Sequence, residues 1–439
     1  MSLKALLAGA GLAALATAAF AQDNAASGPV AFDATLKAHA ELPAQTFVPA
    51  PADAPYGLQM SGRFTSGKRV ETPYGWANPA SGIAMPFPGQ PVQGMSGVRS
   101  LGDDRFVFLT DNGFGNKANS SDAMLMFNFM KMDWENGKVG LERTVFLSDP
   151  NRVVPFPIVT EHSESRYLTG ADFDPESIQP VGDHFWIGDE FGPWLIEVDA
   201  TGVVLQVVAT NPGGVEYKSP DNQFVSTPAG GATVTGVNTG RSGGYEGMAQ
   251  SMDGKTLYPL LEKPFYDEEA GALELIGEQP VIRMLEFNVA DASWSDTVRY
   301  YPLDDAGHAI GDFNIFEGTR GLIIERDNGE GDDGREGAAA FKRIYLVDLE
   351  RADENGVLEK IAYIDLMNIQ DPEGIAPRGS KDGVFTFPFV TIEDVDLVDA
   401  TTIVVANDNN YPGSTGREAG RADDNEYILL DVADFLKAE

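Results

Sequence analysis

Residues 175–193 carry the pattern that decides the fold: Pro175-Glu176-Ser177-Ile178, a turn at Gly182-Asp183, the run His184-Phe185-Trp186-Ile187, and the exit Gly188-Asp189-Glu190-Phe191-Gly192-Pro193. Aromatic and β-branched residues favour strands, and Gly and Asp favour turns. The stretch therefore predicts a β-hairpin. One glutamate lies at the start of its first strand, and another follows its second strand.

The same layout returns along the chain. Complete copies begin at Met95-Ser96-Gly97-Val98, Tyr245-Glu246-Gly247-Met248 and Ile392-Glu393-Asp394-Val395, and a partial copy runs from Gly321 to Glu325-Arg326-Asp327-Asn328. Helical periodicity is scarce, and recurring hairpins are typical of repeat architectures. We therefore predict an all-β chain over residues 56–439, a β-propeller with loop insertions, and its length suggests six or seven blades.

The N-terminus has the features of an export signal. Lys4 precedes the apolar run Ala5–Phe20, and Ala19-Phe20-Ala21 forms a small-residue cleavage site. We expect a signal peptide over residues 1–21, cleaved after Ala21, and a periplasmic or secreted protein without membrane insertion after cleavage. Residues 22–55 are rich in Ala and Pro, and we expect either an ill-ordered arm or a strand that closes the ring.

Composition restricts the chemistry. The chain has 67 acidic and 31 basic side chains, a formal charge of −36, and no cysteine. Such a field disfavours nucleic acid and anionic membranes as partners, and the absence of cysteine excludes disulfides, thiolate metal sites and a catalytic thiol. The acidic excess fits plain solubility, halophilic solvation or cation binding, and the positions of the acids must decide among these.

Those positions favour a cation site. The inner strands of a propeller line one channel, so residues at the same phase of each hairpin converge there. Glu176, Glu246 and Glu393 would meet at the channel mouth, and the hairpin exits would add five further candidate metal ligands: Asp111, Glu190, Glu262, Glu325 and Asp408. Clustered carboxylates either protonate or recruit a cation. Oxygen ligands in irregular loops favour Ca²⁺.

Three basic residues lie next to acidic segments: Arg166, Lys263 and Arg326. Each is either an anion-binding group or one half of a neutralising ion pair. The four histidines are scattered without zinc-site spacing, and there is no Gly-x-Ser-x-Gly elbow or phosphate-binding glycine loop.

The sequence resembles the phytase-like family that has esterase-like activity, a group of exported bacterial propeller proteins. Six segments between about Gly62 and Asp431 carry the resemblance: Ser96-Gly97-Val98 with Asp111-Asn112-Gly113, Asp174-Pro175-Glu176-Ser177-Ile178, Gly188-Asp189-Glu190-Phe191-Gly192-Pro193, Tyr245-Glu246-Gly247-Met248-Ala249, Leu322-Ile323-Ile324-Glu325-Arg326-Asp327, and Asn407-Asp408-Asn409-Asn410. The resemblance implies a propeller fold, hydrolysis of phosphoric esters by analogy with calcium-dependent propeller phytases, and an extracytoplasmic location. Ile392-Glu393-Asp394 departs from the family's Glu-Gly pair.

Three functions remain open from the sequence. The first is a calcium-dependent phosphoric-ester hydrolase, monomeric and acting on a small phosphorylated substrate, with Glu246, Glu176, Arg326, Arg166 and Lys263 as candidate catalytic residues. In that function calcium would engage phosphoryl oxygens and activate water, and the basic groups would stabilise the non-bridging oxygens. The second is a calcium-dependent lactonase or carboxylesterase. The third is a non-catalytic propeller in which calcium only stabilises the ring.

Overall fold

The computed structural model describes residues 28–226, 234–267 and 271–439, so the expected signal peptide lies outside the described residues. The regular structure of this part of the chain is almost entirely β-strand, which confirms the all-β prediction. Within the described residues the helical elements are three short 3₁₀ turns, η1 (Tyr56–Leu58), η2 (Pro212–Gly214) and η4 (Phe435–Lys437). No helix among them is long and apolar enough to cross a membrane.

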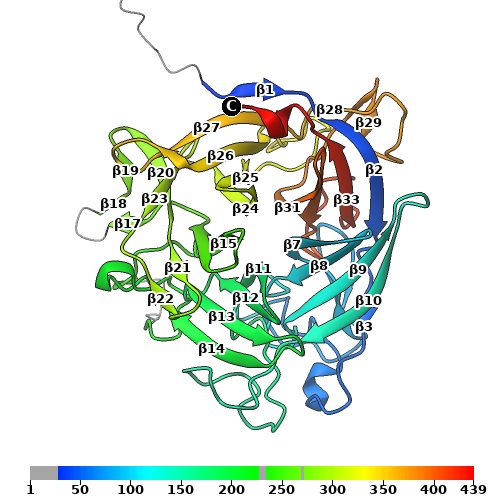
Figure 1. Cartoon of the computed structure of the whole chain (residues 1–439). Coiled ribbons are helices and arrows are strands. Elements are labelled where there is room, and N and C mark those ends of the chain that lie inside the picture. Colours follow the sequence, from blue (N-terminus) through cyan, green and yellow to red (C-terminus); the bar gives the residue numbers. More distant parts are fainter. Residues whose placement is uncertain (1–27, 227–233, 268–270) are drawn as a thin grey trace, which may run out of the picture.

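Most strands belong to five antiparallel groups arranged around a common centre (Figure 1). The first two groups are β7 (Met95–Gly102), β8 (Arg105–Thr110), β9 (Met126–Asp133) and β10 (Lys138–Phe146), then β11 (Pro175–Val181), β12 (His184–Asp189), β13 (Trp194–Asp199) and β14 (Val204–Ala209). The third comprises β15 (Tyr245–Gln250), β16 (Thr256–Leu261), β19 (Leu275–Ile276), β20 (Gln279–Met284), β21 (Phe287–Asn288), β22 (Ser293–Trp294) and β23 (Arg299–Pro302).

The fourth group is β24 (Ala309–Glu317), β25 (Arg320–Arg326), β26 (Lys342–Ala352) and β27 (Leu358–Asp365), with β1 (Val30–Phe32) parallel to β27. The fifth is β31 (Thr391–Asp399), β32 (Thr402–Asp408), β33 (Asn425–Asp431) and β2 (Thr35–Leu42), to which β28 (Ile369–Gln370), β29 (Ser380–Lys381) and β30 (Val384–Phe385) attach. One residue pair between β2 and β10 joins this group to the first. Three two-stranded sheets complete the strands: β3 (Phe47–Val48) with β6 (Gln90–Pro91), β4 (Trp76–Ala77) with β5 (Ala84–Met85), and β17 (Tyr266–Asp267) with β18 (Ala272–Leu273).

The first strands of the five groups form a closed ring at the centre. β7 packs against β11, β11 against β15, β15 against β24, β24 against β31, and β31 against β7 (Figure 1). The hydrophobic clusters lie between neighbouring sheets, for example between the fourth and fifth groups around Ile324 and Val405. Inner strands such as β8 and β32 are buried along almost their whole length, whereas β10 at the outer side of its group is exposed or half-buried along most of its length.

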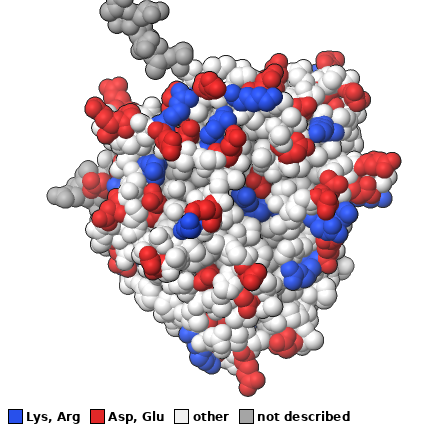
Figure 2. All heavy atoms as spheres, viewed as in Figure 1, with Lys and Arg blue, Asp and Glu red and all other residues white. Residues whose placement is uncertain are grey.

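The described residues therefore form five such strand groups, fewer than the six or seven blades expected from length. Each of the five related hairpins of the sequence begins one group. The remaining described length lies in connections between strands, such as residues 43–94, 147–174, 210–226, 234–244 and 366–390, which contain at most short strands or 3₁₀ turns. Figure 2 shows acidic and basic side chains interspersed over one face of the molecule, without a patch of one sign.

The N-terminal segment contributes to the ring. β2 pairs along β33, from Thr35 opposite Asp431 to Leu42 opposite Asn425. Across this pair His39 Nε2 lies 3.1 Å from Glu426 Oε2, and Arg417 Nη2 lies 2.7 Å from the same oxygen. Burial by itself would raise the pKa of Glu426, but Arg417 and His39 lower that pKa to about 2.

Glu426→Gln is expected to destabilise the protein in a pH-dependent way. The lowered pKa means that ionised Glu426 stabilises the folded state fully above the unfolded pKa near 4.5, and that this contribution is lost as pH falls through about 2. The difference corresponds to roughly 3 kcal/mol at neutral pH. Urea unfolding of both proteins at pH 7 and pH 3 measures it, with Glu350→Gln at an exposed position as control. A loss of equal size at both pH values would contradict a charge-based origin.

Candidate functional site

A β-bulge lies near the start of each of the five central strands. The pairing register shifts at Ser96-Gly97 in β7, Glu176 in β11, Glu246 in β15, Gly311-Asp312 in β24 and Glu393 in β31. A bulge leaves its extra residue outside the ladder and re-aims the side chain. Three of the five equivalent positions are glutamates, and the ring brings these three together.

The central strands lie close to one another because glycine residues occupy or adjoin the bulges. A Cβ atom added to Gly311 would lie 1.9 Å from the carbonyl oxygen of Ile392 on β31, and one added to Gly247 would lie 2.8 Å from the backbone nitrogen of Phe313. Neighbouring central strands therefore approach each other closely where glycine follows or occupies the bulge.

The three bulge glutamates form one buried group. Glu176, Glu246 and Glu393 each offer an oxygen within 4.8 Å of the others. Ser96, which lies in the bulge of β7, also contacts this group, because its Oγ donates a hydrogen bond to Glu393 Oε2 at 3.0 Å. The structure thus brings together the three residues whose convergence the hairpin repeat predicted.

A second ring of residues follows the second strand of each hairpin. Counted from the pairing register, the equivalent positions are Asp111, Glu190, Glu262, Arg326 and Asp408. Asp174, Glu176 and Glu190 form another group with oxygens within 4.8 Å of each other. Arg326 Nη2 lies 3.1 Å from Glu262 Oε1 and 3.3 Å from Glu393 Oε1. One guanidinium therefore stands among the carboxylates.

Burial and mutual repulsion change the acidity of these groups. Burial first, and neighbouring carboxylates second, raise the pKa of Glu176, Glu190 and Glu246 well above the ordinary range. The pKa of Asp111 is likewise raised by burial and then by Asp408, and burial raises the pKa of Asp408 to about 8. If all of these carboxylates were ionised, a cation would have to balance their charge. Without a cation, some of them must be protonated.

Some polar atoms of the cluster have no hydrogen-bond partner within the described residues: Glu190 Oε1, Glu246 Oε1 and Arg326 Nε are all buried. A buried polar atom without a partner is costly. These atoms mark where the site would accept a ligand. A cavity of about 210 Å³ beside Asp111, Phe114, Asn410 and Tyr411 opens on the same end of the ring.

Glu325 is placed differently from the sequence prediction. Its carboxylate accepts hydrogen bonds from the Tyr301 hydroxyl at 2.8 Å and the Asp304 N–H at 2.7 Å, and it also contacts His308 Nδ1 and Lys360 Nζ, so it does not belong to the cluster. Successive strand residues point to opposite sides. The pairing register places the partial repeat one residue later than the sequence prediction does, so Arg326 takes the central position.

The two other basic candidates also differ. Arg166 is buried in the loop before β11, where Nη2 lies 3.0 Å from Asp149 Oδ2 and Nη1 lies 2.8 Å from Glu161 Oε2. It is therefore part of an ion-pair network within that loop, and the prediction of a role in the cluster does not fit this placement. Lys263 lies at the edge of the cluster, with Nζ 2.6 Å from Glu262 Oε2.

Asp174 was missed as a site residue. Asn112 holds it through the backbone N–H at 3.2 Å and the side-chain Nδ2 at 2.7 Å. Its position two residues before Glu176, in Asp174-Pro175-Glu176, was the available signal. The alternation of side chains along a strand does not fix the direction of a side chain that precedes the strand. Only the tertiary structure therefore shows that Asp174 belongs to the site.

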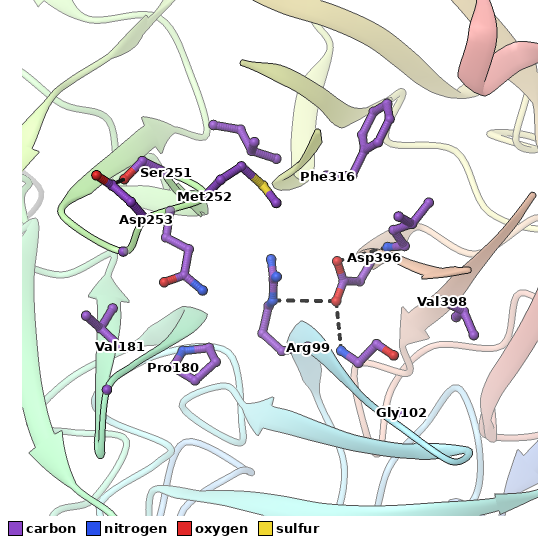
Figure 3. Close-up of a pocket in the computed structure, with 16 residues that line it drawn as sticks. Arg99, Gly102, Pro180, Val181, Ser251, Met252, Asp253, Phe316, Asp396 and Val398 are labelled. Carbon is purple, nitrogen blue, oxygen red and sulfur yellow. Dashed lines mark hydrogen bonds and ion pairs between the residues drawn. The ribbon is translucent and has the colours of Figure 1, made fainter. Parts of the chain in front are cut away.

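The opposite end of the central strands lines a larger cavity of about 600 Å³ (Figure 3). Arg99 points into its middle, and its Nε lies 3.5 Å from Asp396 Oδ2. Between the two ends, Gln179 Nε2 donates to Asn314 Oδ1 at 2.8 Å, and Asn314 Nδ2 donates to the Val395 carbonyl at 2.8 Å. These contacts cross the ring between the carboxylate cluster and this cavity.

Comparison with known families identifies the chain. Residues 90–411 match the family described as phytase-like, with esterase-like activity of phytase. The chain belongs to the phytase-like family. Family membership confirms the resemblance inferred from the six segments and supports a hydrolase. The matched residues include all five central strands and both rings of side chains.

Individual relatives are distant. An uncharacterized secreted protein of Arthroderma benhamiae is 27% identical over 124 residues, which are 26% of this phytase-like chain and 24% of that protein, so only about a quarter of the relative is matched. Solved structures with some similarity include a proposed 6-phosphogluconolactonase from Bacteroides fragilis (11% identity, 79% of this chain and 90% of that chain, TM-score 0.31). Another is an exo-1,5-alpha-L-arabinanase from a bovine ruminal metagenomic library (9% identity, 77% and 92%, TM-score 0.35). At these TM-scores the similarity has no bearing on the site.

Proposed function

We propose that this phytase-like protein is a calcium-dependent hydrolase of phosphoric esters, built as a five-bladed β-propeller with its active site at the carboxylate end of the ring. The observation that carries the proposal is the buried meeting of Glu176, Glu246 and Glu393 with Arg326 beside them. A hydrolase follows from the family, and the phosphoric ester is inferred from this combination of acids and a guanidinium.

The cluster fits a hard divalent cation. Its donors are carboxylate oxygens, which suit Ca²⁺ better than softer metals. The unpartnered oxygens of Glu190 and Glu246 are each buried and free to coordinate. When bound, calcium would supply positive charge that polarises a substrate oxygen and lowers the pKa of water.

The chain's own side chains have distinct tasks in this proposal. Glu176, Glu246 and Glu393 would hold the cation, and a carboxylate such as Glu246 could also accept a proton from water. Arg326 keeps its unpartnered Nε as a donor for a non-bridging phosphoryl oxygen. Lys263, at the edge beside Glu262, would attract an anionic substrate.

We also propose where the protein acts and what it binds. The expected signal peptide and the Arthroderma relative, which is described as secreted, support a periplasmic or secreted protein. The substrate is proposed to be a small phosphorylated molecule bound by a monomer. The strongly acidic composition favours neither nucleic acid nor membranes as partners.

A lactonase or carboxylesterase is the second candidate, because the family description names an esterase-like activity. The two candidates differ in the charge that the substrate must carry. An uncharged ester has no need of Arg326, whereas a phosphoric ester does.

Hydrolysis assays decide between the candidates. We expect the chelated protein to be inactive and calcium to restore hydrolysis of a chromogenic phosphomonoester or phosphodiester, while a chromogenic carboxylic ester and a lactone react slowly or not at all. Arg326→Leu should lower kcat/KM for the phosphoric ester by about 10²-fold or more. Calcium-dependent turnover of the uncharged substrates that Arg326→Leu leaves intact would establish the second candidate. A calcium-dependent rise in Tm without any turnover would establish a non-catalytic binding protein.

A further inference from the structure

The carboxylates of the cluster fall into two groups that share one residue. Asp174, Glu176 and Glu190 form one group, and Glu176, Glu246 and Glu393 form the other. Within each, the ligand oxygens lie within 4.8 Å of one another. Calcium binds oxygens at about 2.3–2.6 Å, so two oxygens on the same ion lie at most about 5 Å apart. Each group has the dimensions to surround one ion.

One ion does not suffice for all five side chains. With the same limit of 4.8 Å between ligand atoms, these five carboxylates form two groups of three and do not form a single group of five. Asp174 and Glu190 therefore lie too far from Glu246 and Glu393 to share an ion with both. Glu176 is the common member, since a carboxylate has two oxygens and can serve both groups.

Each group contains its own unpartnered buried oxygen. Glu190 is 4% exposed and Glu246 is 3% exposed, and one Oε1 of each lacks a hydrogen-bond partner in the described part of the chain. Two separate unpaired acceptors, one in each group, indicate two ligands. A single cation would leave one of them unpaired.

Basic side chains do not neutralise the first group. Among the described residues, no Lys, Arg or His nitrogen lies within 4.0 Å of a carboxylate oxygen of Asp174, Glu176 or Glu190. The nearby cations are engaged elsewhere: Arg326 contacts Glu262 and Glu393, and Lys263 contacts Glu262. Glu262 is thereby paired without a metal ion.

A third group of the same dimensions differs from the two central groups in how its charge is balanced. His39, Glu41 and Glu426 also have ligand atoms within 4.8 Å. There Arg417 and Arg378 already contact the carboxylates, so the charge is balanced by protein side chains. The group of Asp174, Glu176 and Glu190 has no such contact, and the group of Glu176, Glu246 and Glu393 has one, between Arg326 and Glu393.

We propose that the carboxylate cluster binds two divalent cations side by side, one through Asp174, Glu176 and Glu190 and the other through Glu176, Glu246 and Glu393. Glu176 bridges the two positions. The identity of the ion as calcium rests on the proposed function, whereas the number of ions rests on the two groups themselves. Asp174 becomes a metal ligand, and Glu262 does not.

Calcium titration of the mature full-length protein by isothermal calorimetry after chelation tests the stoichiometry. The unaltered protein should bind two ions, Asp174→Asn one, Glu246→Gln one, and Glu176→Gln neither with comparable affinity. Glu262→Gln, which removes a neighbouring carboxylate outside both groups, should still bind two. A stoichiometry of one in the unaltered protein, or two in Asp174→Asn, would overturn the proposal.

A second measurement needs no substitution. Crystals of the unaltered protein grown with strontium, a heavier substitute for calcium, should give two anomalous peaks in the cluster, and one peak or none would contradict two positions. Two bound ions without any hydrolysis would leave this inference standing and remove the proposed function. One bound ion with calcium-dependent hydrolysis would do the opposite.

Discussion

Glu176→Gln is expected to reduce kcat for the phosphoric ester by about 10³-fold or more while the protein stays folded. Glu176 belongs to both carboxylate groups, so its replacement weakens every cation position at once. Loss of a single electrostatic contact to a transition state already costs about 10²–10³-fold in other enzymes, and loss of the cation removes a larger source of positive charge.

The matched control is Glu325→Gln. Glu325 is also buried and also ends a hairpin, but its carboxylate contacts Tyr301 and His308 away from the cluster. Its replacement should reduce stability and leave the activity of the folded fraction within about twofold. Circular dichroism gives the folded fraction, and initial rates at saturating calcium give the activity. Equal losses in the two variants would mean that the cluster is not the active site.

Chelated protein is expected to lose stability as pH rises from 5 to 8, and added calcium should remove the part of this loss that comes from the proposed metal ligands. The pKa of Asp408 is raised to about 8 by burial, against about 3.9 in an unfolded chain. A raised acid pKa means that the folded state keeps a proton that the unfolded state has released. Its stabilising effect is complete below the unfolded pKa and is lost as pH rises through the folded pKa.

The size of this effect is large for one side chain. A group that stays protonated only in the folded state contributes a slope of about 1.4 kcal/mol per pH unit, so Asp408 accounts for roughly 4 kcal/mol between pH 5 and 8. Glu176, Glu190 and Glu246 act in the same direction, because burial raises their pKa values too. Calcium would replace the protons and stabilise the ionised cluster.

Urea unfolding at several pH values, with chelator or with calcium, measures the two slopes. Asp408→Asn supplies an uncharged side chain of the same shape, so the chelated variant should show a slope shallower by about one proton. Stability of the chelated wild-type protein that stays constant or rises between pH 5 and 8 would be inconsistent with buried, mutually repelling carboxylates.

The sequence by itself determined the all-β class, the family and the convergence of Glu176, Glu246 and Glu393. These properties follow from local patterns repeated at the same phase of each hairpin, and a closed ring brings equivalent positions together whatever the length of the loops. The repeat also predicted Glu190 near the centre. Five related hairpins were visible in the sequence, and each begins one strand group.

The tertiary structure alone decided the number of strand groups, the direction of individual side chains and the partners of the basic residues. Long connections between strands account for the chain length from which six or seven blades were expected. A strand has a period of two residues, so an error of one residue exchanged Glu325 for Arg326 at the centre. Arg166 pairs with Asp149 and Glu161 because the fold of its loop brings them within reach, and short-range sequence patterns do not record such contacts.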